Sequence, residues 1–159
     1  MIKNFKKLSE RVLIVSGEMG SGKTVLANQI KDTIGYNCTI YDDFSYKTSN
    51  RPKKRIEYEI LGKIAQLRHI DETLVICVNR YPTGLTRLFN REYFGKIFGW
   101  VFTSINMMDF YDYPITVPKP TVVKFMKKYM FSITKKRKTR PYLLVTKDEQ
   151  KMGRYKIAS

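Results

Sequence analysis

The stretch that most constrains this chain is a glycine-rich octapeptide, residues 17–24, with the sequence GEMGSGKT. It satisfies the phosphate-loop pattern G-x-x-x-x-G-K-[ST], whose glycines let the backbone turn with its N–H groups pointing inward. Residues 11–16 before it form an apolar run typical of a buried strand, and residues 25–30 after it carry apolar side chains at helical spacing. A strand, this loop and a helix in that order predict a site for a nucleoside triphosphate.

Each part of the octapeptide has a predicted role in holding phosphate. The loop amides and the helix N-terminus together form a cradle for anions. Lys23 is predicted to neutralise the terminal phosphates, and the Thr24 hydroxyl is predicted to bind Mg²⁺. The residues expected to contact the nucleotide are Gly17, Glu18, Met19, Gly20, Ser21, Gly22, Lys23 and Thr24.

The rest of the sequence predicts an α/β fold. Strands are expected at 38–44, 73–79 and 97–103, and helices at 55–68 and 85–94, from their apolar patterns. Strands that alternate with helices form a mostly parallel sheet with helices on both faces. A chain of 159 residues is long enough for one domain with a buried core.

Two of these strands have polar residues at their carboxyl ends. Asp42 and Asp43 end one strand, and Asn79 and Arg80 end the next. Because ligands of such sheets bind beyond the carboxyl ends of the strands, we expect these residues and the loop to lie along one edge. Asp42 is predicted to hold the hydration shell of Mg²⁺, and Asp43 to polarise the attacking nucleophile. A solvated turn that happens to contain two aspartates is the alternative.

The charge is strongly positive and unevenly distributed. The formal net charge is +16, and residues 119–159 contain 13 Lys or Arg against 2 acids. We therefore divide the chain into a nucleotide-binding domain, 1–118, and a basic C-terminal extension, 119–159. The extension is expected to hold an amphipathic helix over 122–130, a basic loop over 135–140, and a hairpin made by 142–146 and 150–157.

The basic extension favours an acidic partner. Its cations interleave with Phe125, Tyr129, Phe131 and Tyr142, a composition suited to neutralising a phosphate backbone and stacking on bases. Nucleic acid, with DNA first, is the expected partner. An anionic membrane surface and an ordinary solvated surface are the alternatives.

Two cysteines, Cys38 and Cys77, fall in apolar runs without metal-ligand spacing, so we expect reduced thiols in the core. No apolar run reaches the length of a membrane span, and residues 1–7 lack the apolar core of a signal peptide. These features predict a soluble, cytoplasmic protein.

The order of the motifs resembles the FtsK/HerA group of P-loop ATPases, and most closely its viral genome-packaging and phage-morphogenesis branches. The resemblance covers residues 11–103 and is carried by the loop, by the sequence YDDF at 41–44, by Arg68-His69 and by the strand that ends before Asn79. It implies that Asp42 and Asp43 are the Walker B acids and that Asn79 is the sensor. An arginine acting on a neighbouring subunit of a homo-oligomeric ring would be Arg80, Arg87 or Arg91.

A second resemblance concerns the distance between Thr24 and Asp42. They are only 18 positions apart in the sequence, whereas the FtsK/HerA group places another strand and helix there. In uridine and nicotinamide riboside kinases, the strand directly after the loop helix ends in Asp-Asp-Phe, and one Asp accepts the proton of the substrate hydroxyl. The stretch from Gly22 to Phe44 is similar to that arrangement.

Taken together, the residues and the resemblances predict an enzyme that binds ATP and Mg²⁺ and hydrolyses ATP. Turnover would be coupled to nucleic-acid packaging, translocation or virus assembly. The predicted catalytic residues are Lys23, Asp43, Asn79 and Arg80. A small-molecule kinase and a nucleotide-binding assembly factor are the alternatives.

Overall fold

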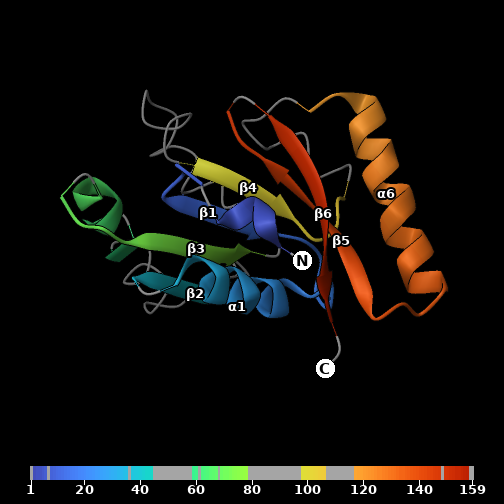
Figure 1. Cartoon of the computed structure of the whole chain (residues 1–159), viewed down its shortest axis with the longest axis horizontal. Coiled ribbons are helices and arrows are strands. Elements are labelled where there is room, and N and C mark those ends of the chain that lie inside the picture. The colour runs from blue at the N-terminus through green and yellow to red at the C-terminus, as the bar shows by residue number, and fades with distance from the viewer. Residues whose placement is uncertain are drawn as a thin grey trace.

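A computed structural model of the chain forms one six-stranded mixed sheet in the order β2-β3-β1-β4-β5-β6 (Figure 1). The strands are β1 (Val12–Ser16), β2 (Cys38–Phe44), β3 (Thr73–Val78), β4 (Phe98–Phe102), β5 (Thr139–Val145) and β6 (Gln150–Lys156). The residues described are 2–6, 8–35, 37–44, 59–60, 62–67, 69–78, 98–106, 117–147 and 149–157, without the side chains of residues 43, 44 and 98. Strands β2, β3, β1 and β4 are parallel, and β5 and β6 are antiparallel additions next to β4.

The helices are η1 (Lys3–Phe5), α1 (Lys23–Ile34) and α6 (Lys119–Thr134), and residues 59–60 and 62–66 are also helical. The predicted α/β class and mostly parallel sheet are therefore confirmed. The strands expected over 38–44, 73–79 and 97–103 occur within one residue of those bounds. The helix expected over 85–94 lies outside the described residues.

Helix α1 begins directly at the end of the glycine-rich loop. Its N-terminal cap, Gly22, has φ 95°, a left-handed conformation that glycine adopts without strain. Its C-terminal cap, Gly35, has φ 98° and donates its N–H to the carbonyl of Lys31. The buried face of the helix, which includes Leu26 and Ile30, packs on the sheet.

The sheet has an apolar core on each face. Alternate residues of β1 point to opposite sides, so Val12 and Ile14 belong to one core while Leu13 and Val15 belong to the other. Helix α1 covers the face of Leu13 and Val15. Residues of α6 and of the helical segment near Ile60 cover the opposite face. All four of these β1 side chains are 0% exposed, as expected for a strand in the middle of a sheet covered on both sides.

Strands β5 and β6 complete the sheet that strands β1 to β4 begin. Strand β5 pairs with β4 through Trp100 to Phe102, and β6 pairs with β5 along its whole length. In Figure 1 the pair β5–β6 crosses the other strands at a steep angle, and α6 lies beside it. The predicted hairpin and amphipathic helix are confirmed, but Thr139 and Arg140 belong to β5 rather than to the expected basic loop, because they pair with Lys156 and Tyr155.

Arg154 attaches α6 to this hairpin. Its guanidinium donates to the hydroxyl of Ser132 at 2.8 Å and to the hydroxyl and carbonyl of Thr139 at 2.9 and 3.0 Å. Arg154, a cation of the basic C-terminal extension, therefore stabilises the packing of α6 against the hairpin.

Cys38 and Cys77 are buried free thiols, as expected. Burial raises the pKa of the Cys38 thiol. None of the helices in the described part of the chain has both the length and the hydropathy needed to cross a bilayer.

We predict that Phe125→Ala lowers the free energy of unfolding by about 3–5 kcal/mol, since Phe125 is 0% exposed between α6 and the sheet. Val123→Ala is the matched control on the same helix, because Val123 is 39% exposed and surface changes cost about 0.5 kcal/mol or less. Urea denaturation measures both. Equal losses would mean that α6 is not part of the cooperative core.

Candidate nucleotide-binding site

The glycine-rich loop connects the carboxyl end of β1 to the N-terminus of α1, at the edge where the parallel strands end. Gly20 and Gly22 have φ 81° and 95°. These left-handed glycines bend the chain around the helix N-terminus, where backbone N–H groups lack helical partners and the helix dipole favours negative charge. The local geometry is that of an anion-binding turn.

Close packing also explains Gly17 and Gly22. A Cβ on Gly17 would clash with the hydroxyl oxygen of Thr103, and a Cβ on Gly22 would lie 2.6 Å from the hydroxyl of Tyr155. A side chain at either position would force the loop or these neighbouring side chains to move. The two glycines are therefore required by the packing around the loop as well as by its turn.

A hydroxyl network holds the inner side of the loop to the segment after β4. The hydroxyls of Ser21 and Thr103 share a buried hydrogen bond of 2.6 Å, and the Thr103 N–H donates to the carbonyl of Ser16 at 2.9 Å. The N–H of Glu18 donates to the Ser104 hydroxyl at 2.8 Å. This network orients the loop before any ligand is bound.

Lys23 closes the loop from its own helix. Its Nζ donates to the carbonyls of Gly17 and Glu18, at 2.9 and 3.0 Å. An ammonium group is thus held across the mouth of the loop, within the space that the turning backbone encloses.

Thr24 and Asp42 meet at the same edge. The Thr24 hydroxyl donates to Oδ2 of Asp42 at 2.8 Å, which brings the start of α1 and the end of β2 together. Donation of the hydroxyl proton to the carboxylate leaves the lone pairs of the Thr24 oxygen available to a cation. Two hard oxygen donors therefore lie side by side next to the loop.

This donor set fits Mg²⁺ rather than a metal that needs a protein cage. Mg²⁺ is commonly held by one or two protein oxygens while phosphates and waters supply the remaining ligands. Among the residues that the structure describes, no three His, Cys, Asp or Glu side chains gather as a metal site. Thr24 and Asp42 are the residues that would hold the ion.

Three side chains from the C-terminal part of the chain contact the outside of the loop. The hydroxyl of Tyr129 donates to Oε1 of Glu18 at 3.1 Å. Arg140 donates to the carbonyl of Gly20 at 3.1 Å, and the Tyr155 hydroxyl donates to the carbonyl of Ser21 at 2.8 Å. We refer to Tyr129, Arg140 and Tyr155 as the loop clamp. Sequence reasoning missed it, because nothing local to these residues indicates a partner more than 100 positions away.

Burial and charge perturb the two tyrosines of the loop clamp. Burial, with a smaller contribution from the neighbouring Glu18 carboxylate, raises the pKa of Tyr129 to about 12. Burial also raises the pKa of Tyr155, while the positive charge of Arg140 acts in the opposite direction. Both phenols therefore stay protonated at neutral pH and keep their hydrogen-bond donors.

The other predicted site residues are placed only in part. Strand β3 ends beside the loop, since the Gly17 N–H donates to the carbonyl of Val78 at 3.4 Å. The residues that follow, Asn79 and Arg80, lie outside the described residues, as do Arg87, Arg91 and the side chain of Asp43. Met19 is 80% exposed, so its side chain extends from the loop into solvent.

The stacking role expected for four aromatic residues must be corrected. Phe125 and Tyr142 are 0% exposed and Tyr129 is 8% exposed, because they pack in the cores or against the loop. Of the four, only Phe131, at 49%, presents a ring to solvent. On α6, the apolar residues at helical spacing face the sheet, as is usual for an amphipathic helix, and Tyr142 packs in the core from β5.

Comparison with family models, with curated proteins and with solved structures finds no match to this chain.

We predict that Tyr155→Phe lowers the free energy of unfolding by about 1–3 kcal/mol, because it leaves the buried carbonyl of Ser21 without its donor. Tyr129→Phe is the matched control: its acceptor, the Glu18 carboxylate, is on an exposed residue that water can solvate. Thermal or urea denaturation compares the two. A Tyr155→Phe variant no less stable than Tyr129→Phe would contradict the buried bond.

Proposed function

We propose that this chain binds ATP and Mg²⁺ at residues 17–24 and hydrolyses ATP, coupling turnover to the packaging or translocation of nucleic acid. The observation that carries the proposal is the hydrogen bond of 2.8 Å between Thr24 and Asp42, beside a loop closed by Lys23. Hydrolysis forms a bond between a water oxygen and the terminal phosphorus, and it breaks the bond between that phosphorus and the oxygen that leaves with ADP. The products are ADP, phosphate and a proton.

The proposed roles follow from what each group can donate. The loop amides and the α1 N-terminus would bind the phosphates, and Lys23 would transfer its hydrogen bonds from the loop carbonyls to phosphate oxygens. Bound Mg²⁺ would neutralise charge on the β- and γ-phosphates. Thr24 and Asp42 would position that ion, and Asp43 would orient the attacking water.

Two of the proposed catalytic residues follow β3. Because β3 lies between β1 and β2 and ends beside Gly17, a side chain following it is suited to sense the terminal phosphate. Asn79 is the proposed sensor. Arg80, Arg87 or Arg91 would stabilise developing charge in a neighbouring subunit of a homo-oligomeric ring, as the FtsK/HerA resemblance implies.

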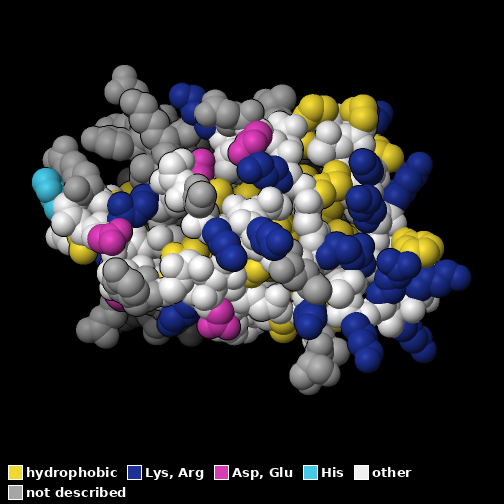
Figure 2. All heavy atoms as spheres, viewed as in Figure 1, with side chains coloured by type: hydrophobic (Ala, Val, Ile, Leu, Met, Phe, Trp, Pro, Cys, Tyr) yellow, Lys and Arg dark blue, Asp and Glu magenta, His cyan; other side chains and the backbone are white. Residues whose placement is uncertain are grey.

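The distribution of charge supports nucleic acid as the partner. Figure 2 shows Lys and Arg side chains gathered over the side of the molecule where α6 lies, while the Asp and Glu side chains of this face lie away from α6. A one-signed surface of this kind attracts a polyanion. Because Tyr129 and Arg140 come from these elements and contact the loop, a partner bound there has a physical route to the nucleotide site.

A small-molecule kinase is the second candidate, and the connection between α1 and β2 favours it. Only residues 35–37 lie between α1 and β2 in the sequence, so β2 is the first strand after the loop helix. Asp42 of this strand accepts the hydrogen bond of Thr24. In a kinase, Asp42 or Asp43 would accept the proton of a substrate hydroxyl. The terminal phosphate would then pass to that hydroxyl instead of to water.

We predict that Lys23→Ala weakens binding of a fluorescent ATP analogue at least tenfold, since the loop loses its only lysine. Lys31→Ala, in the last turn of the same helix, is the charge-matched control. Asp42→Asn should lower affinity in Mg²⁺ and leave affinity in EDTA unchanged, because it removes a charge that acts through the ion. Unchanged affinity in Lys23→Ala would mean that the loop is not the nucleotide site.

ATP turnover distinguishes the two candidate functions. We predict that phosphate release increases when DNA is added, that the increase diminishes as salt rises, and that Lys23→Ala abolishes it. Turnover that ignores DNA but increases with a nucleoside, with a phosphorylated nucleoside as product, would replace the ATPase by the kinase.

A further inference from the structure

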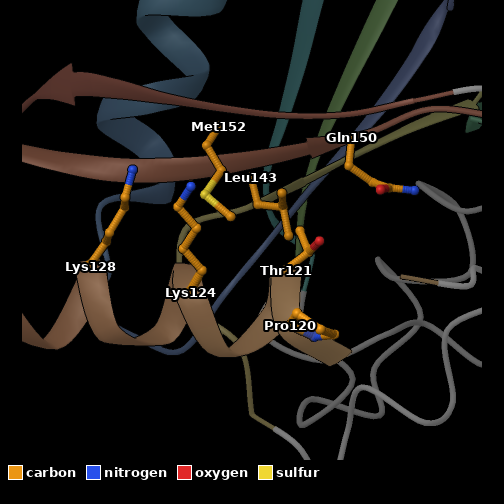
Figure 3. A pocket seen from close by; sticks show the side chains of 7 residues that line it. All are labelled: Pro120, Thr121, Lys124, Lys128, Leu143, Gln150 and Met152. Atoms are coloured by element: carbon orange, nitrogen blue, oxygen red, sulfur yellow. The ribbon is translucent and has the colours of Figure 1, made fainter. Parts of the chain in front are cut away.

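A groove of about 510 Å³ lies between α6 and the β5–β6 hairpin. Thr121, Lys124 and Lys128 line it from the helix, and Leu143, Gln150 and Met152 line it from the strands. Figure 3 shows the two lysines extending from α6 toward the strands, while Leu143 and Met152 point from the strands toward the helix. The groove therefore has a basic wall and an apolar floor.

The basic wall is suited to phosphate groups. Lys124 and Lys128 are four residues apart, so they stand about 6 Å apart along the helix on one flank. None of the described residues that line the groove is a carboxylate, and the sequence from 119 to 147 contains ten Lys or Arg and no Asp or Glu. An anion bound here meets no opposing charge from these lining residues.

The floor and the polar rim are suited to a base and a sugar. Met152 is half-buried and supplies the accessible apolar surface of the floor with its thioether, whereas Leu143 is 0% exposed and packs in the core. Thr121 and Gln150 supply hydroxyl and amide groups that donate and accept hydrogen bonds. A free phosphate or sulfate ion would contact the lysines and make no contact with an apolar floor.

An exposed aromatic ring continues the same flank of the helix. Phe131 follows Lys128 by three residues, is 49% exposed, and lies beneath the guanidinium of Arg137 at 4.9 Å from the ring centroid. Cations alternating with an exposed ring are the usual means of holding single strands, whose unpaired bases can stack on aromatic side chains.

We propose that this groove binds a single-stranded nucleic acid, with Lys124 and Lys128 on backbone phosphates and Phe131 stacked on a base. The proposal rests on the proposed function, for which it names the strand-binding site. Single strands are favoured over duplexes because the exposed ring of Phe131 can stack on the face of an unpaired base. Helix α6 also carries Tyr129 of the loop clamp, so the groove and the nucleotide loop share one rigid element.

The test measures binding of a labelled oligo-dT strand and a duplex of equal length to the full chain by fluorescence anisotropy, over about 50–200 mM salt. Because β5 and β6 belong to the sheet and contribute residues to its cores, the test uses surface substitutions rather than truncation. Lys124→Gln with Lys128→Gln removes the basic wall. Lys119→Gln with Lys127→Gln is the matched control, since it removes the same charge from the same helix outside the groove.

We expect tighter binding of the single strand by the wild type, and a loss of about 1.4 in the slope of log affinity against log salt for the groove pair, at about 0.7 per phosphate contact. The control pair should keep most of the slope. Phe131→Leu should weaken single-strand binding at least about fivefold without changing the slope, because stacking is lost and charge is not.

Other outcomes separate the groove from the proposed function. If the wild type binds the strand but the groove and control double variants lose equal slope, the assignment of the binding site to the groove is wrong while nucleic acid remains the partner. A wild type that retains neither strand nor duplex overturns both. Binding to anionic phospholipid vesicles in preference to oligonucleotide, lost only in the groove pair, assigns the groove to a membrane surface and also overturns the proposal.

Discussion

The position of β1 in the middle of the sheet is the constraint on which the rest of the structure depends. It pairs in parallel with β3 on one side and β4 on the other, and its side chains are buried on both faces. A parallel strand with neighbours on both sides must be followed by a crossover. That crossover is α1, so the turn leading into it lies at the carboxyl edge of the sheet, where the ends of β2, β3 and β4 also arrive.

This arrangement explains why the loop is surrounded by groups from distant parts of the chain. Asp42 comes from β2 and the carbonyl of Val78 comes from β3. Thr103 and Ser104 come from the two residues after β4. Each contact comes from an element whose register is set by pairing, or from the residues that directly follow such an element. A site on such a scaffold is ordered before its ligand binds, which lowers the entropic cost of binding.

The C-terminal segment has two physical roles. Its strands complete the sheet, and its apolar residues complete both cores. Its loop clamp donates hydrogen bonds to the carbonyls of Gly20 and Ser21 and to the Glu18 side chain. Its remaining cations provide the basic surface. One helix, α6, carries both the buried contacts and the groove lysines.

The sequence by itself determined the local elements and their order. The strands at 12–16, 38–44 and 73–78, the loop and α1 follow from apolar runs, glycine positions and helical spacing, which act between near neighbours in the chain. The tertiary structure decided which of these groups meet. The hydrogen bonds of Tyr129, Arg140 and Tyr155 to the loop span 111, 120 and 134 residues, and no local pattern encodes such pairings. It also decided that Phe125, Tyr129 and Tyr142 are core residues while Phe131 is exposed, because burial depends on what packs against a helix as well as on its spacing.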